Sequence, residues 1–332
     1  MNQHLPVLVA SWNGAPATAR ASELARSGTP LLDAIVKGVA LVEDDPTEMT
    51  VGYGGLPNEE GEVELDASVM HGPLHKAGAV AALKRIRNPA AVALEVLRRT
   101  DHALLVGEGA LRFARQVGFS EENLLTPQAR EAWLAWKANL STADAWIGPS
   151  DTRSSFGHAL DAGVASNTSG AQHAGAHIPR TWGTIHVSGL DADSNLFACT
   201  STSGLSYKIP GRVGDSALIG AGIFVDNAIG SAGATGRGEA SLHNCIAYDT
   251  VRAMEAGLSP TDAARQALQR LARNTREPRL LNDRGEPSFN VTVYALRKDG
   301  QCGAASLRSG YTHVVQRGPH TEVLPTSPIF TG

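Results

Sequence analysis

The stretch HIPRTWGTIHVSG, residues 177–189, joins two parts of the chain that differ sharply in character. Residues 155–180 (SFGHALDAGVASNTSGAQHAGAHIPR) are rich in Gly, Ala, Ser and His and show little hydrophobic periodicity. From Thr181 onward, apolar and polar residues alternate in the manner of a β-strand. Loops longer than about 15 residues are uncommon inside compact domains unless they are functional or disordered. We therefore predict a flexible linker over 155–180 and a strand that opens at Thr181.

A threonine that follows a flexible linker has a chemical use if the peptide bond before it is cut. The new α-amine, with a pKa of about 7.7–8, can accept the proton of the threonine hydroxyl and so activate it as a nucleophile. A plainer interpretation is that Thr181 is a good strand former and nothing more. The spacing alone leaves both interpretations open.

Composition limits the classes of function. The chain has 332 residues, of which 42% are hydrophobic and 19% charged, as in an ordinary globular protein. A net charge of -4 and 5% aromatic residues disfavour binding to nucleic acid or to an anionic membrane. No run approaches 18 apolar residues, and the first residues resemble a strand more than a signal peptide. We expect a cytoplasmic protein whose three cysteines, Cys199, Cys245 and Cys302, are reduced and buried.

Hydrophobic patterns along the chain predict an α+β fold. Strands are expected at the start and end of each half, with helices between them, and this indicates two packed sheets covered by helices. In the first half we predict strands over 5–11 and 62–70 and helices over 30–43, 76–87, 89–100, 108–117 and 128–138. In the second half we predict a hairpin over 181–204, helices over 239–255 and 259–273, and strands over 289–296, 302–307 and 313–318. Trp133 and Trp136 are expected to bury one face of their helix.

Two short glycine-containing motifs have side chains suited to binding. In GRVGDS (211–216), Arg212 can bind a carboxylate and Asp215 can bind an ammonium group. The pair could therefore bind both charged backbone groups of an amino acid. The alternative is a solvated surface ion pair of little energetic value. In GATGRGE (233–239), small residues precede a helix and could hold a phosphate or an oxyanion. This segment satisfies neither the P-loop pattern nor the dinucleotide fingerprint.

A metal site is not predicted. His173 and His177 are four residues apart, but they lie in the Gly/Ala-rich run with no carboxylate beside them, so a solvated linker is the better interpretation. No cofactor is expected either.

Taken together, seven ordered segments resemble the glycosylasparaginases, N-terminal-nucleophile hydrolases related to the isoaspartyl-peptidase/L-asparaginases. The resemblance spans nearly the whole chain. The matching segments are LPVLVASWNG (5–14), TVGYGGLPNEEGEVELDA (50–67), GAVAALKRIRNP (78–89), TDHALLVGEGALRFARQVGF (100–119), TWGTIHVSG (181–189), CTSTSGLSYKIPGRVGDS (199–216) and GATGRGE (233–239).

The resemblance implies a four-layer αββα sandwich, with two mainly antiparallel sheets between helix layers. It also implies a single domain, 1–332, that cuts itself into an α chain of 1–180 and a β chain of 181–332, and a homodimer of such αβ units. The activity implied is hydrolysis of the side-chain amide of N-substituted asparagine, GlcNAc-Asn, through a β-aspartyl ester on threonine.

The resemblance also assigns roles to single residues. Thr181 is the implied nucleophile, Thr202 tunes it, and Thr235 and the Gly236 amide form the oxyanion hole. For the substrate, Arg212 holds the α-carboxylate, Asp215 holds the α-ammonium, and Trp12 lines the pocket. Thr50 stands where the family has a small hydroxyl residue near the nucleophile.

One departure from the family concerns processing. Glycosylasparaginases have Asp immediately before the threonine and asparaginase-type relatives have Gly, whereas this chain has Arg180. The carbonyl of this residue is the one attacked in self-cleavage, so we expect cleavage that is slower. Two alternatives stay open: an L-asparaginase or isoaspartyl dipeptidase, and an uncleaved amino-acid-binding or scaffold protein. A phosphate or nucleotide binder acting through GATGRGE is a third, minor one.

Overall fold

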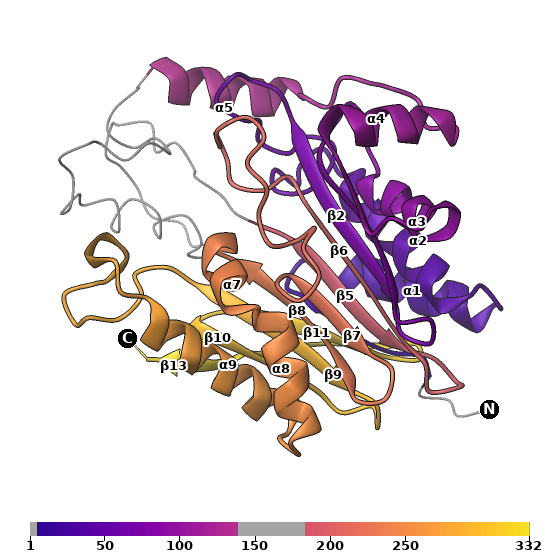
Figure 1. The fold of residues 1–332 in the computed structure, drawn as a ribbon, viewed down its shortest axis with the longest axis vertical. Coiled ribbons are helices and arrows are strands. Elements are labelled where there is room, and N and C mark those ends of the chain that lie inside the picture. The colour runs from indigo at the N-terminus through magenta and orange to yellow at the C-terminus, as the bar shows by residue number, and fades with distance from the viewer. Residues whose placement is uncertain (1–4, 139–182, 332) are drawn as a thin grey trace.

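The computed structural model describes residues 5–138 and 183–331 of the chain (Figure 1). Thr181, Arg180 and the predicted linker over 155–180 lie outside these described residues. The described part forms two β-sheets that pack face to face, with helices on both outer sides (Figure 1).

The larger sheet, as far as the chain is described, has eight strands drawn from both halves of the sequence. The predicted hairpin is confirmed: its strands β5 and β6 pair antiparallel in the middle of this sheet, between β1 and β2. Neighbouring strands are antiparallel except for β3 and β4. Across the sheet the order is β12 (His320–Pro325), β11 (Thr312–Arg317), β1 (Val7–Ser11), β5 (Ile185–Leu190), β6 (Leu196–Thr202), β2 (Glu64–His71), β3 (Lys76–Lys84) and β4 (Leu104–Val106).

The smaller sheet comes entirely from the second half of the chain. Its neighbouring strands are antiparallel except for β10 and β13. Across this sheet the order is β13 (Ser327–Phe330), β10 (Cys302–Arg308), β9 (Val291–Arg297), β8 (Gly230–Gly236) and β7 (Ile223–Asp226).

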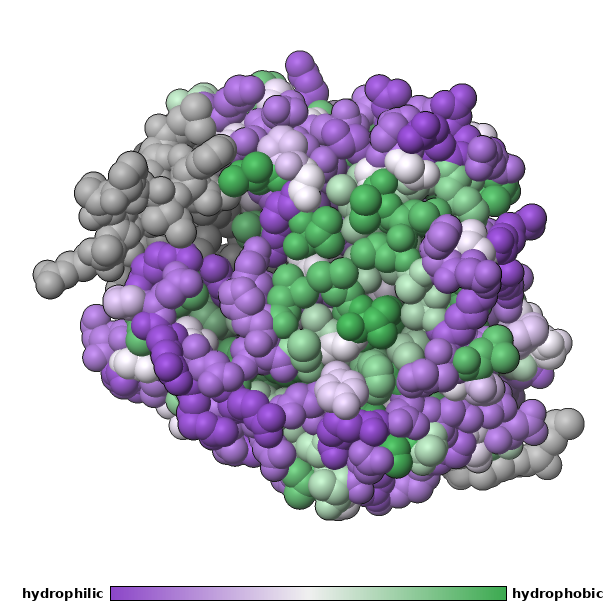
Figure 2. All heavy atoms as spheres, in the orientation of Figure 1, coloured by the Kyte–Doolittle hydropathy of each residue, from purple (hydrophilic) through white to green (hydrophobic). Residues whose placement is uncertain are grey.

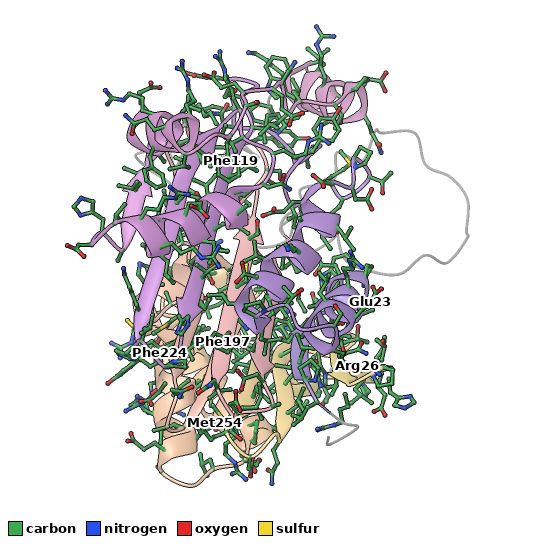
Figure 3. All side chains as sticks on the ribbon, turned by 90° about the vertical axis from the view of Figure 1, so that its right-hand side faces the viewer. Glu23, Arg26, Phe119, Phe197, Phe224 and Met254 are labelled. Carbon is green, nitrogen blue, oxygen red and sulfur yellow. The ribbon has the colours of Figure 1, made fainter. Side chains whose placement is uncertain are left out.

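Helices cover the outer face of each sheet. α1 and α2 pack on β1, β5, β6 and β11 and α3 on β2 and β3, whereas α8 and α9 pack on the smaller sheet (Figure 1). Glu23 and Arg26, on the outer side of α1, point away from the sheet (Figure 3). The helices are α1 (Ala15–Arg26), α2 (Leu31–Glu43), α3 (Pro89–Arg99), α4 (Gly107–Gln116), α5 (Pro127–Ala138), α7 (Gly238–Asn244), α8 (Ile246–Glu255), α9 (Pro260–Asn274) and the short 3-10 helix Pro278–Leu280.

Side-chain alternation along the strands builds the layers. In β1, Leu8 packs in the apolar core beneath α1 and α2, while its neighbour Val9 packs in a second core between the two sheets. A third core, around Leu268 and Val293, lies between the smaller sheet and α9. Three successive cores separate four layers, so the predicted αββα sandwich is confirmed.

The predicted helix over 76–87 is wrong, because this segment forms strand β3. KAGAVAALK is a continuous run of small apolar residues that is buried on both faces, and periodicity cannot separate such a strand from a buried helix. Gly78 lies so close to α3 that an added Cβ would be 2.2 Å from the Ala93 carbonyl oxygen. The small residues therefore allow α3 to approach the sheet closely.

The predicted helix over 239–255 is two helices, α7 and α8, which are separated by Cys245 in a left-handed conformation (φ 45°). Cys245 is also exposed and Cys302 is only partly buried, so the prediction that all three cysteines are buried is confirmed for Cys199 alone. The glycine-rich stretch before these helices forms strands β7 and β8, which the sequence pattern did not predict. Gly257 (φ 97°) follows the end of α8 in a left-handed conformation, and Ser259 caps α9 by accepting the Asp262 N–H.

The predicted burial of the two tryptophans of α5 is confirmed for Trp136, whereas Trp133 is partly buried. Trp136 is 7% exposed and stacks on Tyr207, with 4.6 Å between the ring centroids. The Trp133 Nε1 donates to the Glu59 carbonyl at 3.2 Å. These contacts attach α5 to the loops beside the larger sheet.

Candidate active site

Thr202 lies at the sheet edge where β6 ends and the chain enters β5. Its hydroxyl donates to the Gly183 carbonyl at 2.7 Å and accepts the Gly204 N–H at 2.9 Å. The side chain is buried, so these bonds are shielded from water. Gly183 follows the predicted nucleophile by two positions, so Thr202 contacts the segment next to Thr181 in the sequence.

Thr50 also lies against Gly183. An added Cβ on Gly183 would be 2.0 Å from the Thr50 Oγ1, so a glycine is needed for this close approach. The Thr50 carbonyl accepts the Ser203 N–H at 2.8 Å, and its hydroxyl donates to the Glu48 carboxylate. The structure thus brings Thr50 and Thr202 together around Gly183.

A cavity opens beside this pair of threonines. Four of the predicted site residues line it, namely Thr202, Arg212, Asp215 and Gly236. It is walled by the start of β5, the loop after β6 and the end of β8. The remaining lining residues are Gly183, Thr184, Gly204, Leu205, Gly214, Ser216, Arg237, Gly238 and Glu239.

Arg212 presents one side of its guanidinium to the cavity. Nε and Nη2 donate to the Glu239 carboxylate at 3.0 and 2.8 Å, which fixes the plane of the group. Nη1 faces Gly204 and Gly214, where added Cβ atoms would be 3.4 and 2.9 Å away from it. The two glycines therefore leave room beside Nη1, where a carboxylate could bind.

Asp215 is a buried carboxylate with spare bonding capacity. Its side chain is 4% exposed, and Oδ2 has no hydrogen-bond partner among the described residues. Burial raises the pKa of Asp215 to about 6, while the positive charge of Arg212 opposes this rise. A buried acceptor without a donor is costly, so this carboxylate is suited to an ammonium ligand.

Thr235 and Gly236 end strand β8 at the same edge. The two sheets are aligned there by the hydrogen bond between the Ser188 and Ser231 hydroxyls (2.6 Å) and by the His186 ring against Gly233. These two contacts show that β5 and β8 run in opposite directions across the interface between the sheets. The same offset places Thr184 opposite Thr235. Gly236, with φ 115°, adopts a conformation that favours glycine.

Trp12 follows β1 directly and is 48% exposed. It is not among the residues that line the cavity, and neither are Thr50 and Thr235. Thr181 and Arg180 lie outside the described residues, so the predictions for the nucleophile and the processing residue stay predictions.

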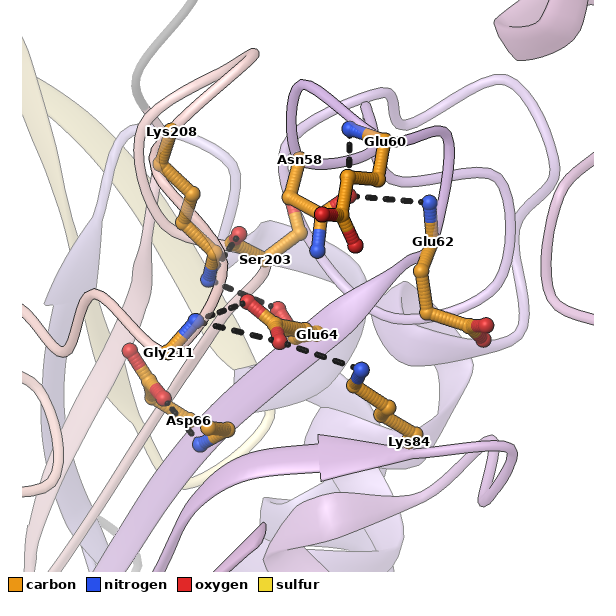
Figure 4. Close-up of polar contacts among 10 residues, drawn as sticks. Asn58, Glu60, Glu62, Glu64, Asp66, Lys84, Ser203, Lys208 and Gly211 are labelled. Atoms are coloured by element: carbon orange, nitrogen blue, oxygen red, sulfur yellow. Dashed lines mark hydrogen bonds and ion pairs between the residues drawn. The ribbon is translucent and has the colours of Figure 1, made fainter. Parts of the chain in front are cut away.

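A charged cluster that the sequence did not reveal holds the Arg212 loop (Figure 4). The Glu64 carboxylate accepts the Gly211 N–H at 3.0 and 3.2 Å, and the Asp66 carboxylate accepts the Gly214 N–H at 3.4 Å. Both side chains lie on the same face of β2, as expected for residues two apart in a strand. They anchor the loop on each side of Arg212.

Lys208 completes this cluster. It is 1% exposed, and its ammonium donates to the carbonyls of Glu64 (3.0 Å) and Ser203 (3.2 Å) (Figure 4). Burial lowers the pKa of Lys208, and the carboxylates of Asp66 and Glu64 oppose this. The alternation in EVELDA could have placed Glu64 and Asp66 on one face, but it could not have paired them with a loop 147 to 148 residues away.

The described part of the chain, residues 5–138 and 183–331, offers neither a cluster of metal-binding side chains nor a membrane-spanning helix. No group of three or more His, Cys, Asp or Glu side chains there is arranged to hold a metal ion. Within the same residues, no helix has the length and apolar character needed to cross a bilayer. His173 and His177 lie outside this part.

Comparison with known proteins agrees with the geometry of the site. The asparaginase family profile matches residues 9–279. The chain belongs to the asparaginase family. It is 37% identical over 322 residues to an N(4)-(beta-N-acetylglucosaminyl)-L-asparaginase of Elizabethkingia miricola, covering 96% of this chain and 84% of that protein.

A rat protein of the same name is also similar to this asparaginase-family chain. The two are 37% identical over 308 residues, which is 92% of this chain and 85% of the rat protein. A putative Drosophila yakuba N(4)-(beta-N-acetylglucosaminyl)-L-asparaginase is 36% identical over 310 residues, with coverage of 91% and 75%. The predicted family and the assignment as an amide hydrolase are therefore confirmed.

Proposed function

We propose that this asparaginase-family protein hydrolyses the side-chain amide of GlcNAc-Asn through a β-aspartyl ester on Thr181. The observation that carries the proposal is a pair of groups in the cavity: Arg212 Nη1, which has room beside it at two glycines, and Asp215 Oδ2, which has no partner among the described residues. An α-amino acid has one carboxylate and one ammonium, and these two groups match them. The names of the relatives from Elizabethkingia miricola and rat support GlcNAc-Asn as the substrate.

The chemistry begins with self-cleavage between Arg180 and Thr181. The free α-amine of Thr181 then takes the proton of its own hydroxyl, and Oγ attacks the side-chain amide carbon of the substrate. Thr235 and the Gly236 N–H donate to the oxyanion, each such donor being worth about 3–4 kcal/mol of barrier. The glycosylamine leaves with a proton from the Thr181 amine, and water hydrolyses the ester to release aspartate.

Two other assignments use the same residues differently. An L-asparaginase or isoaspartyl dipeptidase would bind the aspartyl part identically and differ only in the leaving group. An uncleaved protein would bind an amino acid without turning it over, and Arg180 is the residue that favours this alternative.

We also propose that the mature protein is a cytoplasmic homodimer of αβ units. Apolar side chains gather over the middle of one face of the molecule, which supports an interface there (Figure 2). Val106, at the end of edge strand β4, is 54% exposed. A Val106→Glu variant should sediment as a single αβ unit if this edge joins the two copies, whereas an unchanged sedimentation coefficient would place any interface elsewhere.

The test of the proposed function is an intact-mass spectrum of the denatured protein, followed over days. We expect two fragments, the second beginning with Thr181, and faster cleavage in an Arg180→Gly variant. Release of aspartate from GlcNAc-Asn, asparagine and β-aspartyl dipeptides then ranks the substrates. A single persistent mass, with asparagine bound and not hydrolysed, would favour the binding or scaffold alternative.

A further inference from the structure

Behind the proposed oxyanion hole, a row of buried polar residues runs along strand β9. Its first member, Asn290, has a fixed orientation. The Asn290 Oδ1 accepts the backbone N–H of Arg308 at 3.0 Å, and this N–H can only donate. The amide nitrogen must therefore face the other way, where it donates to the Thr292 Oγ1 at 3.0 Å. The Thr292 hydroxyl is thus an acceptor on that side, and its own proton is left for another partner.

Tyr294 is the next residue on the same face of β9. Its hydroxyl is 3.0 Å from the Thr235 Oγ1 on the neighbouring strand β8, and Thr292 is the cross-strand partner of Thr235. Tyr294 is 1% exposed, and burial raises the pKa of its phenol, so the phenol keeps its proton at neutral pH. A buried phenol proton needs an acceptor, and the Thr235 Oγ1 provides one.

The ring of Tyr294 is held in place from the other sheet. It stacks on His186, with 6.2 Å between centroids and 13° between planes. Both ring nitrogens of His186 are hydrogen-bonded, to Thr200 and Ser188 at 2.8 Å each. Burial lowers the pKa of His186 to about 3, so the imidazole is neutral and adds no charge beside the phenol.

We propose that Asn290, Thr292 and Tyr294 form a one-way hydrogen-bond chain that orients the Thr235 hydroxyl as a donor toward the reacting carbonyl. The observed bonds run from the Arg308 N–H to Asn290 and from Asn290 to Thr292. In the proposed chain the free Thr292 proton goes to the Tyr294 oxygen, and the phenol proton goes to the Thr235 Oγ1. Because the Thr235 Oγ1 accepts from Tyr294, its proton is free, and the described residues offer it no other hydrogen-bond partner. Tyr294 is therefore a positioning residue, since it contacts Thr235 and not the substrate.

This inference rests on the proposed function, and kinetics of fully cleaved protein can test it. Tyr294→Phe removes the hydroxyl and keeps the stacked ring. We expect kcat for GlcNAc-Asn to fall about 10- to 100-fold with KM changed less than about twofold, because only transition-state binding is lost. Thr235→Ala should lower kcat about 100- to 1,000-fold. The double variant should be no slower than Thr235→Ala, because the phenol acts only through Thr235.

Two further variants serve as a graded test and a control. Thr292→Val removes the proposed hydrogen bond from Thr292 to the phenol. It should lower kcat less than Tyr294→Phe does, since the phenol can still donate to Thr235. Tyr248→Phe makes the same chemical change at a half-exposed tyrosine of α8 that packs on Phe224, and should leave kcat unchanged.

The outcomes separate the two proposals. If the wild-type protein is active and Tyr294→Phe has an unchanged kcat, the hydrogen-bond chain is overturned and the proposed function stands. The same holds if the kcat losses of Tyr294→Phe and Thr235→Ala multiply in the double variant. A cleaved wild-type protein that hydrolyses none of the substrates overturns the proposed function and this inference together.

Discussion

The Thr202 hydroxyl and the Gly183 carbonyl are 2.7 Å apart in the buried edge between β5 and β6. The same hydroxyl accepts the Gly204 N–H, so a single side chain connects the start of one strand of the hairpin to the loop that leaves the other. That loop continues to Arg212 and Asp215. Thr202 therefore links the segment after the predicted nucleophile to the predicted substrate-binding residues.

The first prediction tests this link. Thr202→Val keeps the shape of the side chain and leaves a carbonyl and an N–H without their partner, at a cost of about 1–3 kcal/mol in stability. We expect self-cleavage to slow and kcat to fall at least about 10-fold, while Thr202→Ser retains most activity. Cleavage is followed by intact mass and turnover by aspartate release.

Thr250→Val is the matched control. Thr250 is fully buried on α8, its hydroxyl donates to the Ile246 carbonyl at 2.8 Å, and it is not among the residues that line the cavity. It should lose stability but keep cleavage and turnover. Equal losses in both variants would reduce the role of Thr202 to folding alone.

The second prediction concerns Arg212. Arg212→Lys keeps the charge but cannot bind Glu239 through two nitrogens and direct a third to the cavity. We expect KM for the substrate and Kd for the product aspartate to rise about 10- to 100-fold, as for the loss of one charge-assisted hydrogen bond of about 1.5–3 kcal/mol. Arg252→Lys, which alters an ion pair between α8 and Asp226 at the end of β7, should leave both constants unchanged. Similar constants for Arg212→Lys and wild-type protein would remove Arg212 from substrate binding.

Much of this architecture was predictable because the local patterns were unambiguous. The helix at residues 31–43 and the strand at residues 64–71 carry clear apolar spacing, and Ser259 with Pro260 marks a helix start. β3 was mistaken for a helix because a strand buried on both faces has no alternation. β8 was missed because GSAGATG contains residues that disfavour strands, and its burial between two neighbouring strands overrides that preference.

The site was predictable only in part, for a different reason. Arg212 and Asp215 share a short motif, and the resemblance placed Thr202 and Gly236 beside them. Hydrogen bonds such as those from Gly211 to Glu64 or between Tyr294 and Thr235 join residues from distant parts of the chain. Sequence spacing carries no information on such contacts until the strand order is known.

The third prediction concerns the pH dependence of ligand binding. Burial raises the pKa of Asp215 to about 6, and an ammonium ligand binds its ionised form. The affinity for aspartate should therefore level off above about pH 7 and weaken, by up to about tenfold per pH unit, below pH 6. Binding of the product, measured by calorimetry, avoids the separate titration of the Thr181 amine that turnover would include.

Two variants check the assignment of this titration. Asp215→Asn should bind aspartate weakly with no pH dependence between pH 5 and 7. Asp33→Asn, at a surface ion pair with Arg98, should keep the wild-type profile. A wild-type affinity that is flat down to pH 5 would contradict the role of Asp215 in holding the ammonium.

The fourth prediction concerns stability and depends on Glu43, which is fully buried at the end of α2. Its Oε1 accepts the Ser201 hydroxyl at 2.6 Å and the Ala90 N–H at 3.1 Å. Burial nevertheless raises the pKa of Glu43 from 4.5 to about 7. Between these two values the folded protein keeps a proton that the unfolded chain has released. Stability must therefore fall as pH rises through this range.

The size of this effect is set by the difference between the two pKa values. At 1.36 kcal/mol per pKa unit, the free energy of unfolding should drop by roughly 3 kcal/mol between pH 4.5 and 7 relative to Glu43→Gln, and stay level above pH 7. Urea unfolding of both proteins at equal extents of cleavage measures this difference, with Glu23→Gln on the exposed side of α1 as the control. A pH-independent difference would mean that Glu43 is already ionised at pH 5. The hydrogen bonds from Ser201 and Ala90 would then outweigh the cost of burying its charge.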